Sequence, residues 1–272
     1  MAMIEEAAKA IKEADFLLIT AGAGMGVDSG LPDFRGVEGF WRAYPVAKRL
    51  GLRFEELANP RWFDEDPSLA WAFYGHRLHL YRDTTPHEGF SKLLDIAKSK
   101  KDYFVFTSNV DGQFQKAGYS NRKIYEVHGS IHYLQCTTPC SDDIWSAKDV
   151  RIDIDEERFL AKEPLPRCKR CGRIARPNIL MFGDWAWVDR RAAQQQEYFE
   201  SFLNRAYGNL AIIEFGAGTA VPTVRLMGER IAKNFKAPLI RVNPREPEGA
   251  DISLAMGAKE AILEIAKKID YV

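Results

Sequence analysis

The chain has 272 residues, of which 46% are hydrophobic, and its 38 basic side chains balance 38 acidic ones. This length suits one large domain, or one domain with a smaller inserted module, and the hydrophobic fraction excludes wholesale disorder. The charge balance and the lack of any apolar run near ~18 residues predict a cytoplasmic protein that binds neither nucleic acid nor a membrane.

Helical and strand patterns alternate along most of the chain. Residues 3–14 carry apolar side chains at helical spacing, and residues 16–20 form a short apolar run rich in strand formers. Further buried strands are predicted at 103–107, 210–215 and 239–242. Helical patterns between the strands cover 88–98, 189–204 and 221–235. This alternation predicts an α/β fold, with a parallel sheet covered by helices on both faces.

Two stretches interrupt the alternation. Residues 37–85 are rich in Phe, Tyr and Trp but contain no obvious buried strand, so we expect a helical insertion that packs beside the sheet. Residues 131–180 contain all four cysteines, several prolines and short polar strands. This composition predicts a small module organised by a metal ion.

The four cysteines come as two close pairs, Cys136-x3-Cys140 and Cys168-x2-Cys171. Four cysteines are too few for a disulfide-dense secreted domain, and this spacing is typical of four thiolates around a tetrahedral Zn²⁺. Four sulfur ligands leave no open coordination position, so such a zinc ion would be structural. The alternative is a set of unrelated buried cysteines.

The first predicted strand ends in a glycine turn, Ala21-Gly22-Ala23-Gly24-Met25-Gly26. Small residues at such a place let backbone N–H groups approach a phosphate. The spacing does not match GxGxxG, however, and a purely structural turn fits the pattern equally well. Residues 28–36 then place a proline, an aromatic residue and an arginine where a loop could fold over a bound ligand.

A polar cluster at 107–111, Thr107-Ser108-Asn109-Val110-Asp111, follows the strand-like run at 103–106. Polar side chains at the carboxyl end of a parallel strand project into the crevice where α/β proteins bind ligands. In isolation, an Asx-turn or a helix cap is the favoured explanation of Asn109 or Asp111.

His128 follows a strand-like run at 124–127 and precedes Gly129, which leaves room for a substrate. This setting distinguishes it from the other four histidines, although a hydrogen-bonded core histidine is the more common case. Two further strand ends carry small or polar residues, at 218–219 and 243–246, and either could contact a nucleotide.

In this order, the segments resemble the sirtuin family of NAD-dependent protein deacylases over nearly the whole chain. The matching segments are Gly22-Ala23-Gly24, Asp33-Phe34-Arg35-Gly36, Thr107–Asp111, His128-Gly129, both cysteine pairs, Arg176-Pro177, Phe182-Gly183-Asp184, Gly218-Thr219 and Asn243-Pro244-Arg245-Glu246. The resemblance implies a Rossmann-like NAD-binding large domain made of residues 1–36, 86–130 and 178–272. It also implies a small domain made of the helical insertion (37–85) and the zinc-binding module (131–177).

The resemblance further implies roles for individual residues. NAD would contact Gly22, Ala23, Gly24, Asp33, Phe34, Arg35, Ser108, Asn109, Asp111, Gly218, Thr219, Asn243 and Arg245. Asn109 and Asp111 would hold the nicotinamide end, and His128 would be the general base that takes a proton from a ribose hydroxyl. Phe182 and Gly183 would border the channel for an acyl-lysine protein or peptide, which adds as a strand. The implied products are free lysine, nicotinamide and O-acyl-ADP-ribose.

Two local features bear on the reaction. Tyr74-x-x-Arg77 resembles the signature of the desuccinylase and demalonylase branch, in which this pair binds the acyl carboxylate, but an ordinary amphipathic helix carries the same spacing. Ser108 stands where sirtuins usually carry glutamine, which leaves an ADP-ribosyltransferase or an NAD glycohydrolase as the alternative. A module that senses NAD or ADP-ribose without turnover is a third hypothesis, which the retained His128 disfavours.

Overall fold

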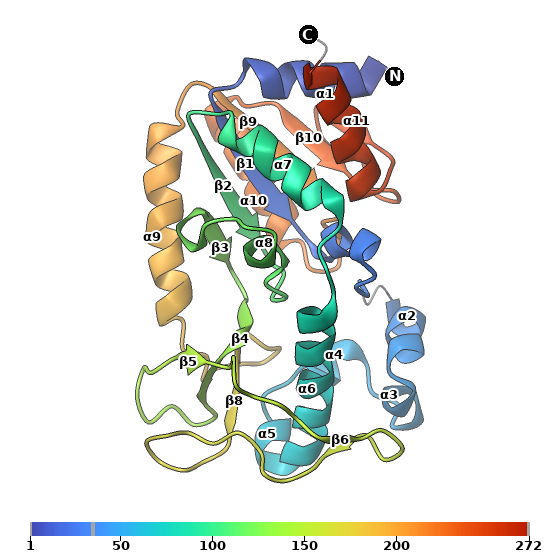
Figure 1. Cartoon of the computed structure of the whole chain (residues 1–272), viewed down its shortest axis with the longest axis vertical. Coiled ribbons are helices and arrows are strands. Elements are labelled where there is room, and N and C mark those ends of the chain that lie inside the picture. The colour runs from blue at the N-terminus through green and yellow to red at the C-terminus, as the bar shows by residue number, and fades with distance from the viewer. Residues whose placement is uncertain (1, 34–35, 271–272) are drawn as a thin grey trace.

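A six-stranded parallel sheet forms the centre of the larger part of the computed structural model, which describes residues 2–33 and 36–270 (Figure 1). Its strands are β1 (Phe16–Ala21), β2 (Asp102–Thr107), β3 (Ile124–Glu126), β9 (Leu210–Phe215), β10 (Leu239–Val242) and β11 (Ile252–Leu254). They lie in the order β11-β10-β9-β1-β2-β3, and every neighbouring pair is parallel. The carboxyl ends of all six strands therefore meet at one edge of the sheet.

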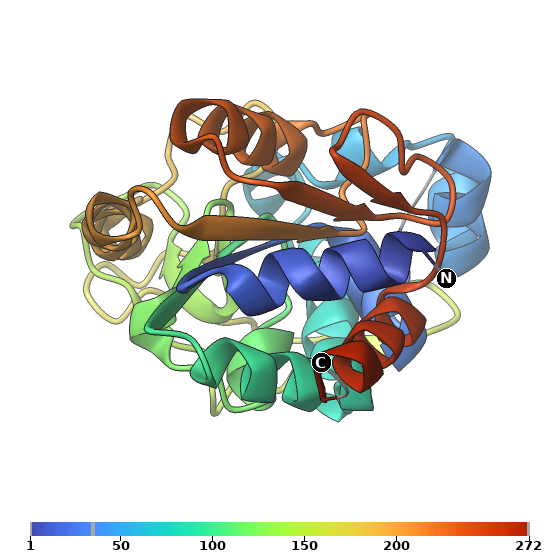
Figure 2. The same ribbon diagram turned by 90° about the horizontal axis from the view of Figure 1, so that it is seen from above.

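Helices cover both faces of this sheet (Figure 2). One face carries α1 (Ala2–Glu13), α7 (Glu88–Lys98) and α11 (Ala258–Asp270), and the other carries α9 (Arg190–Arg205) and α10 (Thr223–Phe235). In β1, Leu17 and Ile19 belong to the first face's core, whereas Leu18 packs with Phe199 and Ile231 of the second. Because both faces are buried, these strands are continuous apolar runs. The predicted α/β fold is confirmed.

A smaller part of the chain combines short helices with antiparallel strands (Figure 1). The helices are α2 (Gly36–Ala43), α3 (Pro45–Arg49), α4 (Phe54–Leu57), α5 (Trp62–Glu65) and α6 (Pro67–Asp83). The strands β4 (Gly129–Cys136), β5 (Trp145–Ser146) and β8 (Ala175–Ile179) form one sheet, and β6 (Ile154–Asp155) pairs with β7 (Leu160–Ala161). The predicted boundaries between the large and the small domain lie after residues 130 and 177. Strand β4 begins two residues before the first boundary, and strand β8 ends two residues after the second. The domain boundaries stay a prediction.

The longest helix of this smaller part, α6, is fixed at its start and along its buried face. Asp66 caps its N-terminus by accepting a hydrogen bond from the Leu69 backbone N–H at 3.0 Å, and Pro67 occupies the first helical position. Further along, the fully buried indole of Trp71 donates to the Ala175 carbonyl of β8 at 2.9 Å. These contacts hold α6 against the small sheet. In this position, Tyr74 and Arg77 line a cavity between the large sheet and the smaller part of the chain.

Three short elements complete the described chain: η1 (Ala23–Ser29), α8 (Gln113–Lys116) and η2 (Asn121–Lys123). The first two follow the carboxyl ends of β1 and β2 and so lie beside the crevice edge of the sheet. Among the residues that the structure describes, no helix has both the length and the apolar content needed to cross a membrane.

Candidate active site

A cavity of about 940 Å³ lies between the carboxyl edge of the large sheet and the smaller part of the chain. Its walls come from the loops after β1, β2, β9 and β10, from α6, and from residues 179–182 after β8. A parallel α/β sheet binds its ligands at this edge. The site residues expected from the sequence can therefore be placed relative to this cavity.

The glycine turn after β1 touches the loop after β9 backbone to backbone. A Cβ atom on Gly24 would lie 2.6 Å from the Gly216 Cα, and Gly24 N–H donates to the Gly216 carbonyl at 3.1 Å. Gly216 has a φ of +56°, which a side chain would strain. Gly22 and Ala23 line the cavity, whereas Gly24 packs behind it. The turn thus has a structural purpose in addition to the predicted ligand contact.

The polar cluster after β2 is tied to that turn. Asn109 donates from Nδ2 to the Gly22 carbonyl at 2.9 Å, and its own N–H donates to Thr107 Oγ1 at 3.0 Å. Ser108, Asn109 and Asp111 all line the cavity. These hydrogen bonds fix the direction of the cluster, and the ligand contacts of these residues stay a prediction.

The carboxyl of Asp111 has an unusual environment. Burial raises its pKa to about 6, and the carboxylate of Glu126 adds to this effect. The Gln113 N–H, which donates to Asp111 Oδ1 at 2.9 Å, and the nearby Arg77 guanidinium act in the opposite direction. The balance leaves an acid that titrates close to physiological pH, as is common at functional sites.

His128 lies in the two-residue link between β3 and β4, and its side chain lines the cavity. Burial lowers the pKa of the imidazole, and a hydrogen bond with the backbone of Ser108 opposes this effect. The next residue, Gly129, has a φ of +79°, and a Cβ there would lie 2.1 Å from the Asn178 carbonyl oxygen. A side chain at residue 129 would collide with β8, so this glycine allows the close approach that places His128 at the cavity wall.

In the same cavity, Arg77 is buried among aromatic side chains of α6 and α4. It donates from Nε and Nη2 to the Tyr81 hydroxyl at 3.1 and 3.0 Å, and its guanidinium lies 5.3 to 5.8 Å from the ring centres of Phe54, Phe73 and Tyr74. Burial raises the pKa of Tyr74 to about 12, so its hydroxyl stays protonated and can donate a hydrogen bond. Tyr74, Arg77 and Tyr81 line the cavity together.

The lip of the cavity is formed by the turn that contains Phe182 and Gly183. The Phe182 N–H donates to the Ala58 carbonyl at 3.0 Å, and the exposed Phe182 ring meets the Phe54 ring edge-on. Behind the turn, Arg176 and Asp184 form a fully buried ion pair at 2.8 Å. Phe182 lines the cavity, whereas Gly183, with a φ of +67°, turns the chain beside it.

The loops after β9 and β10 close the remaining side. Thr219 donates to Glu246 Oε1 at 2.7 Å, and Gly218, Thr219, Arg245 and Glu246 line the cavity. Asn243 is fully buried behind this wall, where it donates to the Ala217 carbonyl and accepts hydrogen bonds from the backbone of Arg245 and Glu246. Asn243 therefore holds the loops after β9 and β10 together through its side-chain hydrogen bonds.

Three predicted NAD contacts, Asp33, Phe34 and Arg35, belong to the segment that follows the glycine turn. Asp33 lines the cavity near the glycine turn. The predicted NAD contacts of Phe34 and Arg35 lie outside the described residues.

The four cysteines gather at the end of the small sheet, away from the cavity. All four Sγ atoms lie within 4.8 Å of one another, and the pairs Cys136–Cys171 and Cys140–Cys168 are separated by 3.6 Å. Four thiolates at about 2.3 Å from a tetrahedral zinc ion would be about 3.8 Å apart, so the geometry fits zinc. Because four thiolates fill the coordination sphere, such an ion would organise the small sheet and take no part in chemistry at the cavity.

The sequence profile of the Sir2 family matches residues 22–202 of the chain. The chain belongs to the Sir2 family. A relative from Thermococcus kodakarensis named NAD-dependent protein deacylase is 33% identical over 98% of this chain and 96% of its own length. One from Pyrococcus furiosus with the same name is 29% identical over 98% of both chains.

Solved Sir2 structures have the same fold. A mutant Sir2 homologue in complex with ADP-ribose has a TM-score of 0.76 and 26% identity, covering 98% of this chain and 96% of that one. A Sir2 homologue in complex with NAD has a TM-score of 0.76 and 27% identity, covering 98% and 94%. The family predicted from the ordered motifs is thereby confirmed.

Tyr81, Val110 and Glu246 are among the cavity residues of this Sir2 chain that were missing from the predicted site. Tyr81 lies one helical turn after Arg77, so the i, i+4 spacing along α6 could have found it. Glu246 was visible as a polar residue after a strand, but its contact with Thr219 joins two loops that are 27 residues apart. Local sequence patterns carry no signal for such a pair.

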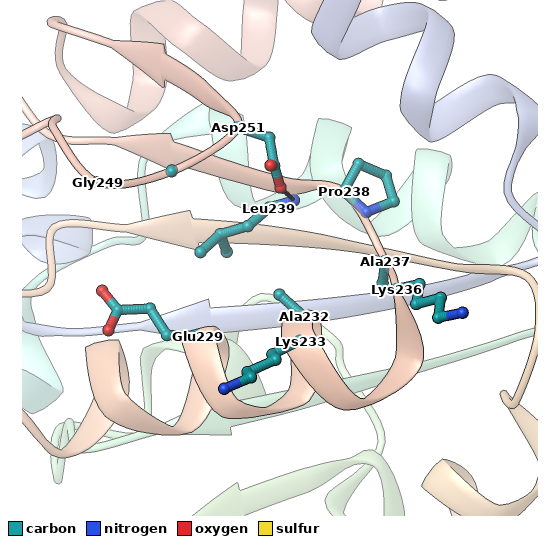
Figure 3. A pocket seen from close by; sticks show the side chains of 10 residues that line it. Glu229, Ala232, Lys233, Lys236, Ala237, Pro238, Leu239, Gly249 and Asp251 are labelled. Atoms are coloured by element: carbon teal, nitrogen blue, oxygen red, sulfur yellow. Dashed lines mark hydrogen bonds between the residues drawn. The ribbon is translucent and has the colours of Figure 1, made fainter.

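A second cavity, of about 770 Å³, opens at the amino end of β10, beside the C-terminus of α10 (Figure 3). Its acidic side chains are already engaged: Asp251 accepts a hydrogen bond from the Leu239 backbone at 2.8 Å, and Glu229 pairs with Arg241. Lys233 and Lys236 lie on its exposed side. This second cavity lies at the strand end opposite the 940 Å³ cavity.

Proposed function

We propose that this Sir2 protein is an NAD-dependent protein lysine deacylase whose reaction takes place in the 940 Å³ cavity. The observation that carries the proposal is the convergence of His128, Asn109 and Asp111 on one cavity that has an aromatic lip at Phe182. The names of the curated relatives agree with the predicted NAD-dependent deacylation. The substrate is expected to be an acyl-lysine side chain of a protein or peptide.

The residues present fit an NAD molecule. The cavity is within the usual size range of cofactor sites, and small residues at Gly22, Ala23 and Gly218 leave the backbone accessible. At one end, Thr219 and Glu246 offer a hydroxyl and a carboxylate that suit ribose hydroxyls. At the other end, Asp111 offers a carboxyl that suits a carboxamide. When bound, NAD supplies a ribose carbon from which nicotinamide leaves and to which the acyl oxygen attaches.

The side chains of this chain then have distinct tasks. Asn109 and Asp111 orient the nicotinamide end, and the buried walls exclude water that would otherwise compete with the acyl oxygen. His128 takes a proton from a ribose hydroxyl, a step for which its lowered pKa keeps the imidazole neutral. The lip at Phe182 borders the entrance for the acyl-lysine chain.

A single substitution tests this assignment. His128→Ala should remove most release of deacylated peptide and O-acyl-ADP-ribose, measured by mass spectrometry with NAD and a panel of acyl-lysine peptides. The matched control is His76→Ala, because His76 is exposed on α6 and contacts Tyr44 rather than the cavity. Undiminished turnover in His128→Ala would refute the base. Nicotinamide release without any acyl peptide, or an ADP-ribosylated product, would favour the glycohydrolase or transferase alternative.

We further propose that Tyr74 and Arg77 select an acidic acyl group, such as succinyl or malonyl. A buried guanidinium beside a protonated phenol can bind a carboxylate through charge-assisted hydrogen bonds. Arg77→Met should then lose activity on succinyl-lysine at least tenfold more than on acetyl-lysine. An equal loss on both peptides, at an unchanged melting temperature, would show that Arg77 only holds Tyr81 and the surrounding rings in place.

A further inference from the structure

His132 is a histidine of β4 that the proposed mechanism does not use. It is half-buried, does not line the cavity, and lies between His128 and the zinc-ligand candidate Cys136 along the chain. Its Nε2 donates a hydrogen bond to the carbonyl oxygen of Asp111 at 2.8 Å. The ring therefore contacts the backbone of a residue whose carboxyl faces the cavity.

The fit between this ring and the loop after β2 is close. Gly112 has a φ of +70°, and a Cβ there would lie 2.7 Å from both Cδ2 and Nε2 of His132. One residue earlier in β4, the Ile131 N–H donates to the Val110 carbonyl at 3.0 Å. Two successive carbonyls of the loop thus accept hydrogen bonds from two successive residues of β4. Without the imidazole, the Asp111–Gly112 peptide has space to rotate, and its rotation would move the Asp111 carboxyl.

We propose that His132 is a positioning residue, which holds the Asp111 carboxyl in the orientation that the nicotinamide end of NAD requires. The inference rests on the proposed function for the assignment of Asp111 to that end. It makes β4 a link between the cysteine cluster and the NAD pocket, since the same strand carries both His132 and Cys136. His132 acts through Asp111 and touches neither NAD nor the acyl group.

Calorimetric titration of the full, zinc-loaded chain with NAD and, separately, with ADP-ribose tests the proposal. His132→Leu should raise the Kd for NAD about tenfold, the effect of one net hydrogen bond, and change the Kd for ADP-ribose less than twofold, because ADP-ribose lacks nicotinamide. His132→Gln, whose amide nitrogen can reach the Nε2 position, should restore NAD binding to within about threefold. His79→Leu is the matched control: His79 is half-buried and contacts the Ile152 backbone away from the cavity.

Three results would overturn the proposal. These are an unchanged Kd for NAD in His132→Leu, equal losses for NAD and ADP-ribose, or a His132→Gln protein that behaves like His132→Leu. If His132→Leu does not fold, His132→Asn, whose amide is one carbon shorter than that of Gln, replaces it in the same comparison. A wild-type chain that binds NAD but deacylates no peptide would refute the proposed function, while these binding ratios would still decide the role of His132.

Discussion

The substitution Asp111→Asn should make the folded protein more stable at neutral pH while it removes deacylase activity. The carboxyl of Asp111 is held in a buried setting in which its pKa rises to about 6 from an ordinary value of 3.8. Asparagine has nearly the same shape, and its Oδ1 can still accept the hydrogen bond from Gln113. The substitution therefore removes the cost of the charge and leaves the packing in place.

The pKa values give the size and the pH dependence of this effect. Below pH 3.8 the carboxyl is neutral in both the folded and the unfolded chain, and the raised pKa costs no stability. Between pH 3.8 and 6 the carboxyl ionises more readily in the unfolded chain than in the folded one, so the cost grows over this range and levels off above pH 6 at about 3 kcal/mol, at 1.4 kcal/mol for each pKa unit. This is an upper limit, since Asp111 lines a cavity that admits water. At pH 4.5 the same reasoning gives about 1 kcal/mol.

Urea unfolding of both proteins, followed by circular dichroism at pH 4.5, 6 and 7.5, measures the difference. Any release of zinc at low pH affects both proteins and cancels in their difference. The control is Asp95→Asn on the exposed side of α7, which should change the free energy of unfolding by less than about 0.5 kcal/mol. A mutant that is no more stable than wild type at pH 7.5, or that gains as much at pH 4.5, would refute the argument.

Three further outcomes follow from the same geometry. Gly129→Ala should lose both activity and stability, because the new Cβ would meet the Asn178 carbonyl. The control is Gly51→Ala, where φ is +68° but no atom lies within 4 Å of the new Cβ, and the substitution should cost only about 1–2 kcal/mol of stability. Equal losses of stability in the two variants, measured by thermal unfolding, would contradict this prediction. Removal of zinc by a chelator, or Cys168→Ser, should lower the melting temperature and the activity together, and an unchanged metal-free protein would contradict a structural zinc ion. The lowered pKa of His128 predicts that its protonation reduces kcat/KM only below pH 6.5, and a decline that begins above pH 7 would count against it.

Buried strands were the easiest elements to predict. The limits of β9 and β10 coincide with largely apolar runs in the sequence, because both faces of the sheet are covered. Each of these strands carries one charged side chain, Glu214 or Arg241, and the two form a buried ion pair. The strand β11 was not predicted, since three residues are too few to show a period. The helix α11 was also missed, although its buried Ala261, Ile262 and Ile265 have helical spacing.

In the candidate site, the residues that follow predicted strands could be located from the sequence, whereas the long-range contacts that support them could not. The place of His128, Asn109 and Asp111 at the cavity could be predicted because each follows a strand, and the carboxyl ends of parallel strands meet at one edge. Their roles were implied only by the family resemblance and stay a prediction. Their supports could not be predicted. The contact of His132 with Asp111 joins the small sheet to the large one, and only the folded chain brings these two elements together.

The link between the two sheets is shortest at the proposed base. Only Val127 and His128 separate β3 of the large sheet from β4 of the small one. A two-residue connection allows little relative displacement, so any swing of the small part must pivot close to His128. The lip at Phe182 lies near the same pivot, because the N–H of Leu180, two residues before Phe182, donates to the His128 carbonyl at 2.9 Å. We therefore expect the imidazole and the lip to keep nearly the same separation during such a swing, so that a movement of the small part changes the rest of the cavity and leaves the entrance beside the base almost unaltered.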